Sequence, residues 1–120
     1  MYYRHVEARP RHLQLYVTRS GRAPFDYWLN KLSDRMARAK IRIRLERLED
    51  GNLGHTAPVG QGVMELKINY GPGYRVYFGQ EGTVTVLLLC GGDKSTQDQD
   101  IRIAQDYWKD YQQRREKHHG

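Results

Sequence analysis

Basic and phenolic side chains gather in the second half of this sequence, in a pattern that suits the binding of a phosphate group. The candidates between residues 60 and 100 are Lys67, Tyr70, Arg75, Tyr77 and Lys94. Guanidinium and ammonium groups bind phosphate oxygens, while an exposed tyrosine can stack on a base or donate a proton. His55 lies just upstream in the glycine-rich segment 51–62, which could be a mobile active-site loop or a plain connector between a helix and a strand.

Two strands are expected to position the central members of this group. Apolar residues at 64, 66 and 68 alternate with polar ones, and the alternation resumes through 74, 76 and 78. Such alternation is typical of strands with one buried and one exposed face. Gly71-Pro72-Gly73 separates the two runs and predicts a tight connection, so the strands should form an antiparallel hairpin.

The register of this hairpin follows if both apolar sets face the core. A loop at residues 71–73 then pairs Ile68 with Val76, and Lys67 with Tyr77. Because directly opposed residues share a face, Lys67, Arg75 and Tyr77 are expected to cluster on the solvent-exposed face of the hairpin. A slip by one residue would bury Arg75 without a partner, so this register should be preferred.

The remaining elements predict an α+β domain. Residues 83–90 form a nearly continuous apolar run, as expected for a central strand buried on both faces. Residues 12–18 alternate as a first strand, and helical spacing predicts helices from Pro24, over about 34–50, and after residue 96. This order implies a single domain with an antiparallel sheet, two N-terminal helices packed on one face and a C-terminal helix. The ordered core should cover about residues 12–110, with residues 112–120 frayed.

Composition restricts the classes of protein that remain. Lysine and arginine number 20 against 14 acidic residues, and residues 1–60 carry the excess. A basic excess indicates a nucleic acid or an acidic protein as partner, although a basic protein without such a partner shows the same balance. The single cysteine excludes an internal disulfide and fits a reducing compartment, so we expect a cytoplasmic protein.

Several kinds of site are excluded by missing patterns. The sequence has no C-x-x-C, no H-E-x-x-H and no EF-hand loop, and its glycine clusters are too short for a P-loop. We therefore expect no metal ion and no cofactor. No apolar run approaches the ~20 residues that a membrane span needs, so no membrane partner is expected.

Each candidate also has a purely structural interpretation. Lys67 could pair with Glu65. Arg75 could form a salt bridge on the face of the sheet, and Tyr77 could pack across the strands. Their expected position on one face of one hairpin favours a shared function over three separate structural roles.

Longer segments carry a resemblance to a known family. The stretches MELKINYGPGYRVYF and LLLCGGDKSTQDQDI, with FDYWLNKL and GNLGHTAPVGQGV, resemble the phage-derived, HigB-like "addiction module killer" branch of the RelE/ParE toxin superfamily. The resemblance covers about residues 12–110. It implies a RelE-like α+β domain and a bacterial toxin of a type II toxin–antitoxin system.

For the site, the resemblance implies a ribosome-dependent mRNA endonuclease. The arginine of the family's G-Y-R motif matches Arg75, and a basic residue on the preceding strand matches Lys67. With Tyr77 these residues form the expected catalytic set, which needs no metal. A basic residue after the last core strand matches Lys94. The expected RNA-binding set is Lys94, Tyr70 and His55.

The resemblance also implies partners. They are mRNA, the ribosome and a cognate antitoxin, which in this branch is often a helix-turn-helix DNA-binding protein. Met36 and Ile43 lie outside the main apolar stripe of the second helix and either face the first helix or anchor a partner. Because apolar anchors usually carry more binding energy than rim charges, we predict that the antitoxin contacts the helical layer at least as much as the catalytic face.

A second function stays open. The tyrosine that RelE carries on its C-terminal segment aligns near Asp100, so the resemblance assigns no general acid or base. ParE-like proteins use the same fold to inhibit DNA gyrase without cutting RNA. Codon-positioned cuts in mRNA would support the first function, and gyrase-linked DNA breaks with intact mRNA would support the second.

Overall fold

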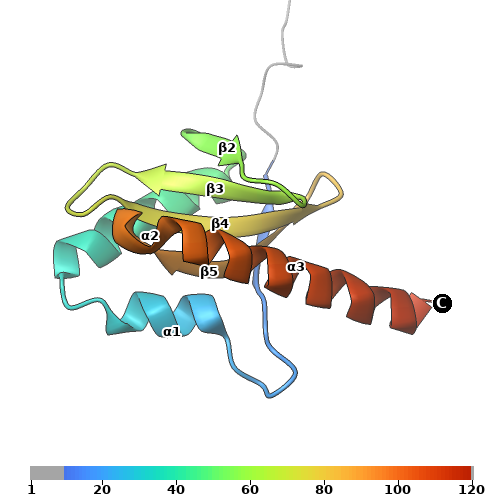
Figure 1. The fold of residues 1–120 in the computed structure, drawn as a ribbon. Coiled ribbons are helices and arrows are strands. Elements are labelled where there is room, and N and C mark those ends of the chain that lie inside the picture. The colour runs from blue at the N-terminus through green and yellow to red at the C-terminus, as the bar shows by residue number, and fades with distance from the viewer. Residues whose placement is uncertain (1–9, 120) are drawn as a thin grey trace, which may run out of the picture.

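The computed structural model describes residues 10–119, which form one five-stranded sheet with helices on both faces (Figure 1). The strands are β1 (His12–Leu15), β2 (Thr56–Pro58), β3 (Val63–Ile68), β4 (Tyr74–Glu81) and β5 (Thr85–Gly92). The helices are α1 (Pro24–Lys31), α2 (Arg35–Glu49) and α3 (Gln97–His119), with a short 3-10 helix, η2 (Lys94–Thr96), directly before α3. The α+β class is confirmed, as are two N-terminal helices and a C-terminal one.

The strands lie in the order β1-β5-β4-β3-β2. The β3–β4 and β4–β5 pairs are antiparallel as predicted. Strand β2, which is antiparallel to β3, was not predicted, because it lies within the segment 51–62 that was expected to be a loop or connector. Strand β1 runs parallel to β5, so the expected antiparallel sheet is wrong for this pair. A parallel pair requires a long crossover between the strands, and here α1, α2 and the β2–β4 segment supply it. Strand β5 therefore lies inside the sheet and is buried on both faces, as predicted.

Two apolar cores lie on opposite faces of the sheet. In Figure 1, α2 passes behind the strands and α3 crosses in front of them. The helix residues of the core on the α2 side are Phe25, Leu29, Ala37, Ile41, Leu45 and Leu48. The core on the α3 side contains Tyr16, Val63, Tyr77, Leu87, Leu89, Cys90, Ala104 and Trp108. Because α3 covers the second face, the prediction that this face of β3 and β4 meets solvent is wrong over most of its length.

Local sequence signals set the starts of the first two helices. Pro24 occupies the first turn of α1, where its missing N–H costs no hydrogen bond. The Asp34 carboxylate caps α2 by accepting the backbone N–H groups of Met36 at 2.9 Å and Ala37 at 3.2 Å. Both starts agree with the sequence expectation.

The hairpin of β3 and β4 has a longer loop than predicted. Ile68 pairs with Tyr74, Lys67 with Arg75 and Glu65 with Tyr77, a register displaced by two residues. The turn spans residues 69–73 and is closed by the backbone N–H of Gly73, which donates to the carbonyl of Tyr70 at 3.1 Å. Because side chains alternate with a period of two, this displacement keeps every residue on its predicted face while changing its partner.

Glycines allow the helices to approach the sheet closely. A Cβ at Gly79 would overlap the Trp108 ring of α3, and a Cβ at Gly91 would overlap the Trp28 ring of α1. A Cβ at Gly92 would overlap the Asp100 carboxylate. Each glycine is therefore part of the contact that seats a helix on the strands.

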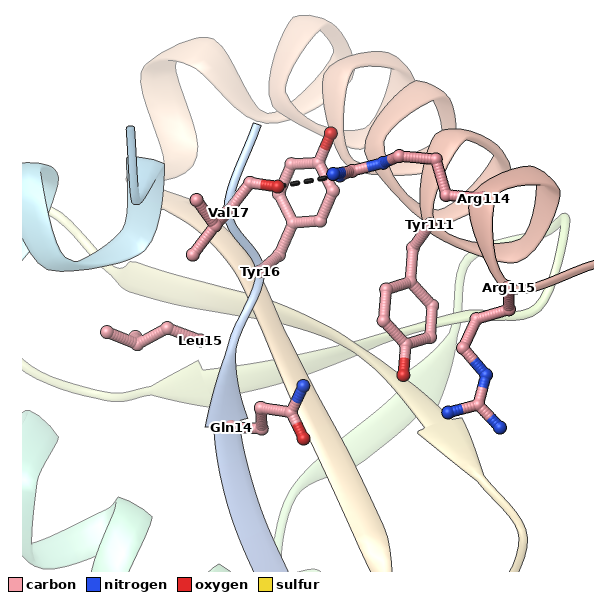
Figure 2. A pocket seen from close by; sticks show the side chains of 7 residues that line it. All are labelled: Gln14, Leu15, Tyr16, Val17, Tyr111, Arg114 and Arg115. Carbon is pink, nitrogen blue, oxygen red and sulfur yellow. Dashed lines mark hydrogen bonds between the residues drawn. The ribbon is translucent and has the colours of Figure 1, made fainter. Parts of the chain in front are cut away.

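Polar contacts join the C-terminal half of α3 to the segment that follows β1. The Asp110 carboxylate accepts the Tyr16 hydroxyl at 2.6 Å and Arg19 Nε at 2.8 Å. Arg114 Nη2 donates to the carbonyl of Val17 at 2.6 Å, the dashed contact in Figure 2. Helix α3 continues past residue 112 to His119, and these contacts lie along it as far as Arg114.

Candidate functional site

Three neighbouring chain segments bring His55, Lys67 and Arg75 into one cross-strand row. Lys67 on β3 lies directly opposite Arg75 on β4. His55 lies immediately before β2, and its carbonyl accepts the backbone N–H of Lys67 at 3.1 Å. The side chains of His55 and Lys67 are exposed, whereas that of Arg75 is buried.

Lys94 joins this row at the β3–β4 turn. A Cβ added at Gly73 would lie 3.1 Å from Arg75 Nη1 and 3.7 Å from the Cβ of Lys94. The turn therefore lies between the guanidinium of Arg75 and the base of the Lys94 side chain. We call His55, Lys67, Arg75 and Lys94 the basic end of the sheet.

The guanidinium of Arg75 is fixed from two sides. The residue is 5% exposed, and its Nη1 donates to the carbonyl of Gly73 at 2.6 Å. Its Nε lies 3.7 Å from Glu65 Oε2 and has no hydrogen-bond partner among the described residues. Arg75 thus takes the salt-bridge role that the sequence left open, while one buried donor remains unsatisfied.

Glu65 connects the elements of the basic end and was not among the predicted site residues. Its Oε2 accepts the Tyr77 hydroxyl at 3.0 Å and Gln97 Nε2 at 2.9 Å, in addition to the ion pair with Arg75. These contacts tie β3 and β4 to the first residue of α3. The sequence offered one signal for this role, an acidic residue flanked by apolar positions within a strand.

Tyr77 does not lie where the sequence analysis expected it. The residue is fully buried, so it cannot stack on an RNA base in this structure. Burial and the hydrogen bond to Glu65 raise the pKa of the Tyr77 hydroxyl well above its ordinary value, so this phenol stays protonated and holds Glu65. The expected exposed position of Tyr77 is wrong because α3 covers this part of β4.

Tyr70 faces the opposite layer of the molecule. Its hydroxyl donates to Asp34 Oδ2 at 3.0 Å, and the ring lies 5.3 Å from Lys40 Nζ. The hydrogen bond to Asp34 raises the pKa of the Tyr70 phenol. Tyr70 therefore contacts the start of α2 rather than the basic end.

A shallow hollow of about 390 Å³ lies beside Lys94 at the start of α3. Its lining residues are Lys94, Ser95, Thr96, Gln97, Asp98, Gln99 and Arg102. Arg102 adds a further exposed cation that the sequence analysis did not single out. A second hollow, between β1 and the end of α3, holds none of the predicted site residues (Figure 2).

Neither a metal site nor a membrane-spanning helix is found in residues 10–119. Residues 10–119 contain no cluster of histidine, cysteine, aspartate and glutamate that could hold a metal ion. In the same part of the chain, no helix has both the length and the apolar character needed to cross a bilayer.

The protein is a small α+β domain with a cluster of basic residues at one end of its sheet. Comparison with known protein families shows which family it belongs to. The family model of phage-derived Gp49-like proteins matches residues 27–109, and the chain belongs to this family. The family is toxin-like and related to RelE and HigB.

A relative from Haemophilus influenzae carries no functional description. This uncharacterised protein is 54% identical over 80 residues, which are 67% of this chain and 81% of the relative. No solved structure matches the chain.

Proposed function

We propose that this protein is the toxin of a type II toxin–antitoxin system and cleaves mRNA on the ribosome. The observation that carries the proposal is the basic end, where Lys67 lies opposite Arg75 and the β3–β4 turn brings Lys94 beside them. Membership in a toxin-like family supports it. The proposed partners are mRNA, the ribosome and an antitoxin.

The chemistry requires deprotonation of a ribose 2′-OH, attack on the adjacent phosphate and protonation of the leaving 5′ oxygen. Arg75 is held in place by Glu65 and Gly73, and its positive charge would stabilise charge on a phosphate bound by the exposed Lys67 opposite it. Lys67 and Lys94 bind the flanking phosphates. His55 is the proposed proton carrier in place of Tyr77, since its side chain is exposed, its backbone pairs with that of Lys67, and histidine is the side chain that most often serves as general acid or base.

One observation favours the ParE-like alternative, in which the protein inhibits DNA gyrase without cutting RNA. Arg75 is buried and held by Glu65, and Tyr77 is fully buried. A scissile phosphate would therefore reach only part of the proposed catalytic set. A protein partner could bind the exposed residues of the basic end without needing contact with Arg75.

A reconstituted bacterial translation reaction separates these functions. We expect the purified protein to produce mRNA 5′ ends at codon-spaced positions, detected by primer extension. Lys67→Ala and Arg75→Ala should reduce cutting on the order of 10²–10³-fold, as expected for the loss of a group that stabilises the transition state. Lys109→Ala, which removes an exposed cation from the outer side of α3, should cut at the wild-type rate.

Because Arg75 is buried, its variant also needs a test of folding. Circular dichroism should show native helix content before a loss of cutting is assigned to the chemistry. Intact mRNA in the wild-type reaction, together with gyrase-linked breaks in plasmid DNA, would overturn mRNA cleavage in favour of gyrase inhibition.

A further inference from the structure

The outer surface of α2 carries an apolar line that no part of the described chain covers. Met36 is 54% exposed and Ile43 is 47% exposed, so α1 does not cover either side chain. With exposed Ala39 they follow the spacing i, i+3, i+7, which places all three on one side of a helix. This line runs along about two turns of α2.

Cations flank the apolar line on both sides. Successive helical residues are rotated by about 100°. This rotation places Arg35 and Arg42 along one side of the line, and Lys40 and Arg47 along the other. All four side chains are exposed. The outer face of α2 therefore means these four cations and the apolar residues between them.

The charge of this face is not neutralised within the described residues. The ion pairs found there involve Arg19, Arg75, Arg114 and Arg115, none of which belongs to α2. Glu46 lies near the apolar line and makes none of these pairs. Lys40 lies over the Tyr70 ring, a contact that leaves its charge in place.

The combination of an apolar line with flanking cations favours some kinds of binding partner over others. A nucleic-acid backbone would satisfy the cations but would leave Met36 and Ile43 against phosphates. An amphipathic helix with an apolar stripe and acidic flanks satisfies both kinds of residue at once, as helix-in-groove and coiled-coil pairs do. The pattern on this face thus favours a protein.

We propose that the outer face of α2 is a docking surface for an acidic amphipathic helix of a partner protein. In identifying that partner as the antitoxin the proposal rests on the proposed function, but the surface itself does not. Basic flanks speed the encounter with an acidic helix, and the central apolar residues hold it. The basic end of the sheet lies on the far side of β3 from α2, so such a helix would leave Lys67 uncovered.

The test uses a fluorescein-labelled synthetic helix with leucines at spacings of three and four and glutamates on both flanks. Fluorescence anisotropy should show binding to the wild-type protein. Met36→Glu combined with Ile43→Glu should weaken this binding about tenfold or more, as loss of central apolar anchors does. Arg42→Gln combined with Arg47→Gln should weaken it less and should reduce its dependence on salt, because the electrostatic part is screened.

The matched control is Val17→Glu combined with Val84→Glu. These valines are 43% and 54% exposed and belong to the segment after β1 and to the β4–β5 turn rather than to α2, and the pair adds the same charge. Wild-type affinity in the control, with affinity lost in the α2 pair, supports the proposal. Equal losses in both pairs, or no binding of the peptide to the wild-type protein, would overturn it.

A single-stranded RNA of mixed sequence serves as competitor. The proposal is wrong if the RNA displaces the peptide, if RNA binding is lost in the Arg42 and Arg47 variant, and if it is kept in the Met36 and Ile43 variant. That combination would mean that this face binds nucleic acid. None of these measurements requires RNA cleavage. A protein without nuclease activity that still binds the peptide through α2 would therefore overturn the proposed function alone.

Discussion

On each face of the sheet a tryptophan from a helix packs against a strand glycine. The two faces differ in whether their charged side chains are buried or exposed. On one face Trp28 of α1 lies against Gly91, and on the other Trp108 of α3 lies against Gly79. In each case a strand glycine gives room to a large aromatic ring. The two faces therefore share this close contact between a strand glycine and an indole, and they differ in their polar residues.

Polar groups are buried on the α3 side and exposed on the α2 side. Under α3, Glu65 accepts hydrogen bonds from Tyr77 and Gln97 and pairs with Arg75. The core under α1 and α2 is formed by apolar residues, while four cations of α2 are exposed, namely Arg35, Lys40, Arg42 and Arg47. The proposed site therefore lies on the face where polar groups are buried, and the proposed docking surface lies on the side where cations are exposed.

The largest effect is expected at the contact between Gly79 and Trp108. Gly79→Ala places a methyl group where the indole lies, and overpacking of this kind costs about 1–3 kcal/mol in the free energy of unfolding, occasionally more. Urea unfolding followed by circular dichroism measures this cost. If α3 seats on β4 through this ring, the variant should lose more stability than any exposed substitution on α2.

A double-mutant cycle checks the cause. Once Trp108→Leu has removed the ring, the additional cost of Gly79→Ala should be much smaller than in the wild-type background. Equal costs in both backgrounds would mean that the glycine is needed for the strand itself and not for the helix above it.

A similar effect, without the occasional larger cost, is expected from neutralising Glu65. Glu65→Gln leaves Arg75 without its carboxylate in a buried position, which should lower the free energy of unfolding by about 1–3 kcal/mol. Glu46→Gln on the exposed side of α2 is the matched control and should change stability by less than about 0.5 kcal/mol. Similar losses in the two variants would contradict the difference between the faces.

Two aspartates near helix starts should respond to acid in opposite senses. The N–H of Ala37 and further hydrogen bonds lower the pKa of Asp34 below its ordinary 3.8, so its contribution to stability is present above that value and is lost as the pH falls through the folded pKa. Burial raises the pKa of Asp100 above 3.8, so stability decreases as the pH rises from 3.8 through its folded pKa.

Urea unfolding of single variants over about pH 2–7 would separate the two contributions. Asp34→Asn should weaken the loss of stability in acid. Asp100→Asn should remove a loss that occurs on raising the pH. A steeper acid loss in Asp34→Asn, or an unchanged profile in Asp100→Asn, would show that the paired assignment is wrong.

The smallest effect concerns Cys90 in the core under α3. Burial and the nearby Asp100 raise the pKa of its thiol to about 12, and only the thiolate reacts with alkylating agents. Iodoacetamide at about pH 8 should leave the native protein unmodified and alkylate it in urea. Rapid alkylation of the native protein would indicate that this core opens more easily than the core under α2.

Much of the helical layer could be predicted because its signals are local. Pro24 and the Asp34 cap each act within one turn, and the buried stripe of α2 repeats at helical spacing. The hairpin faces were also predictable, since alternation fixes them. Its register was not, because a displacement by two residues preserves the alternation and only the turn distinguishes the two pairings.

The environment of the candidate site depended on contacts distant in sequence. Nothing within β4 indicates that Arg75 and Tyr77 are buried, since that follows from α3 crossing the same face. The only indication in the sequence that α3 packs over β4 was the combination of Gly79, a glycine within a strand, and Trp108, an indole on the apolar side of a helix. The proximity of Lys94 to Arg75 likewise required the turn at Gly73, whose path the sequence did not determine.

The short outer strand β2 limits strand pairing with a second chain at this border of the sheet. Exposed sheet edges recruit strands from other molecules, and natural proteins counter this with very short edge strands and proline. Strand β2 spans only Thr56–Pro58, and Pro58 has no backbone N–H to donate. A second chain approaching this border therefore finds almost no ladder to extend, so the border beside His55 is a poor template for strand addition.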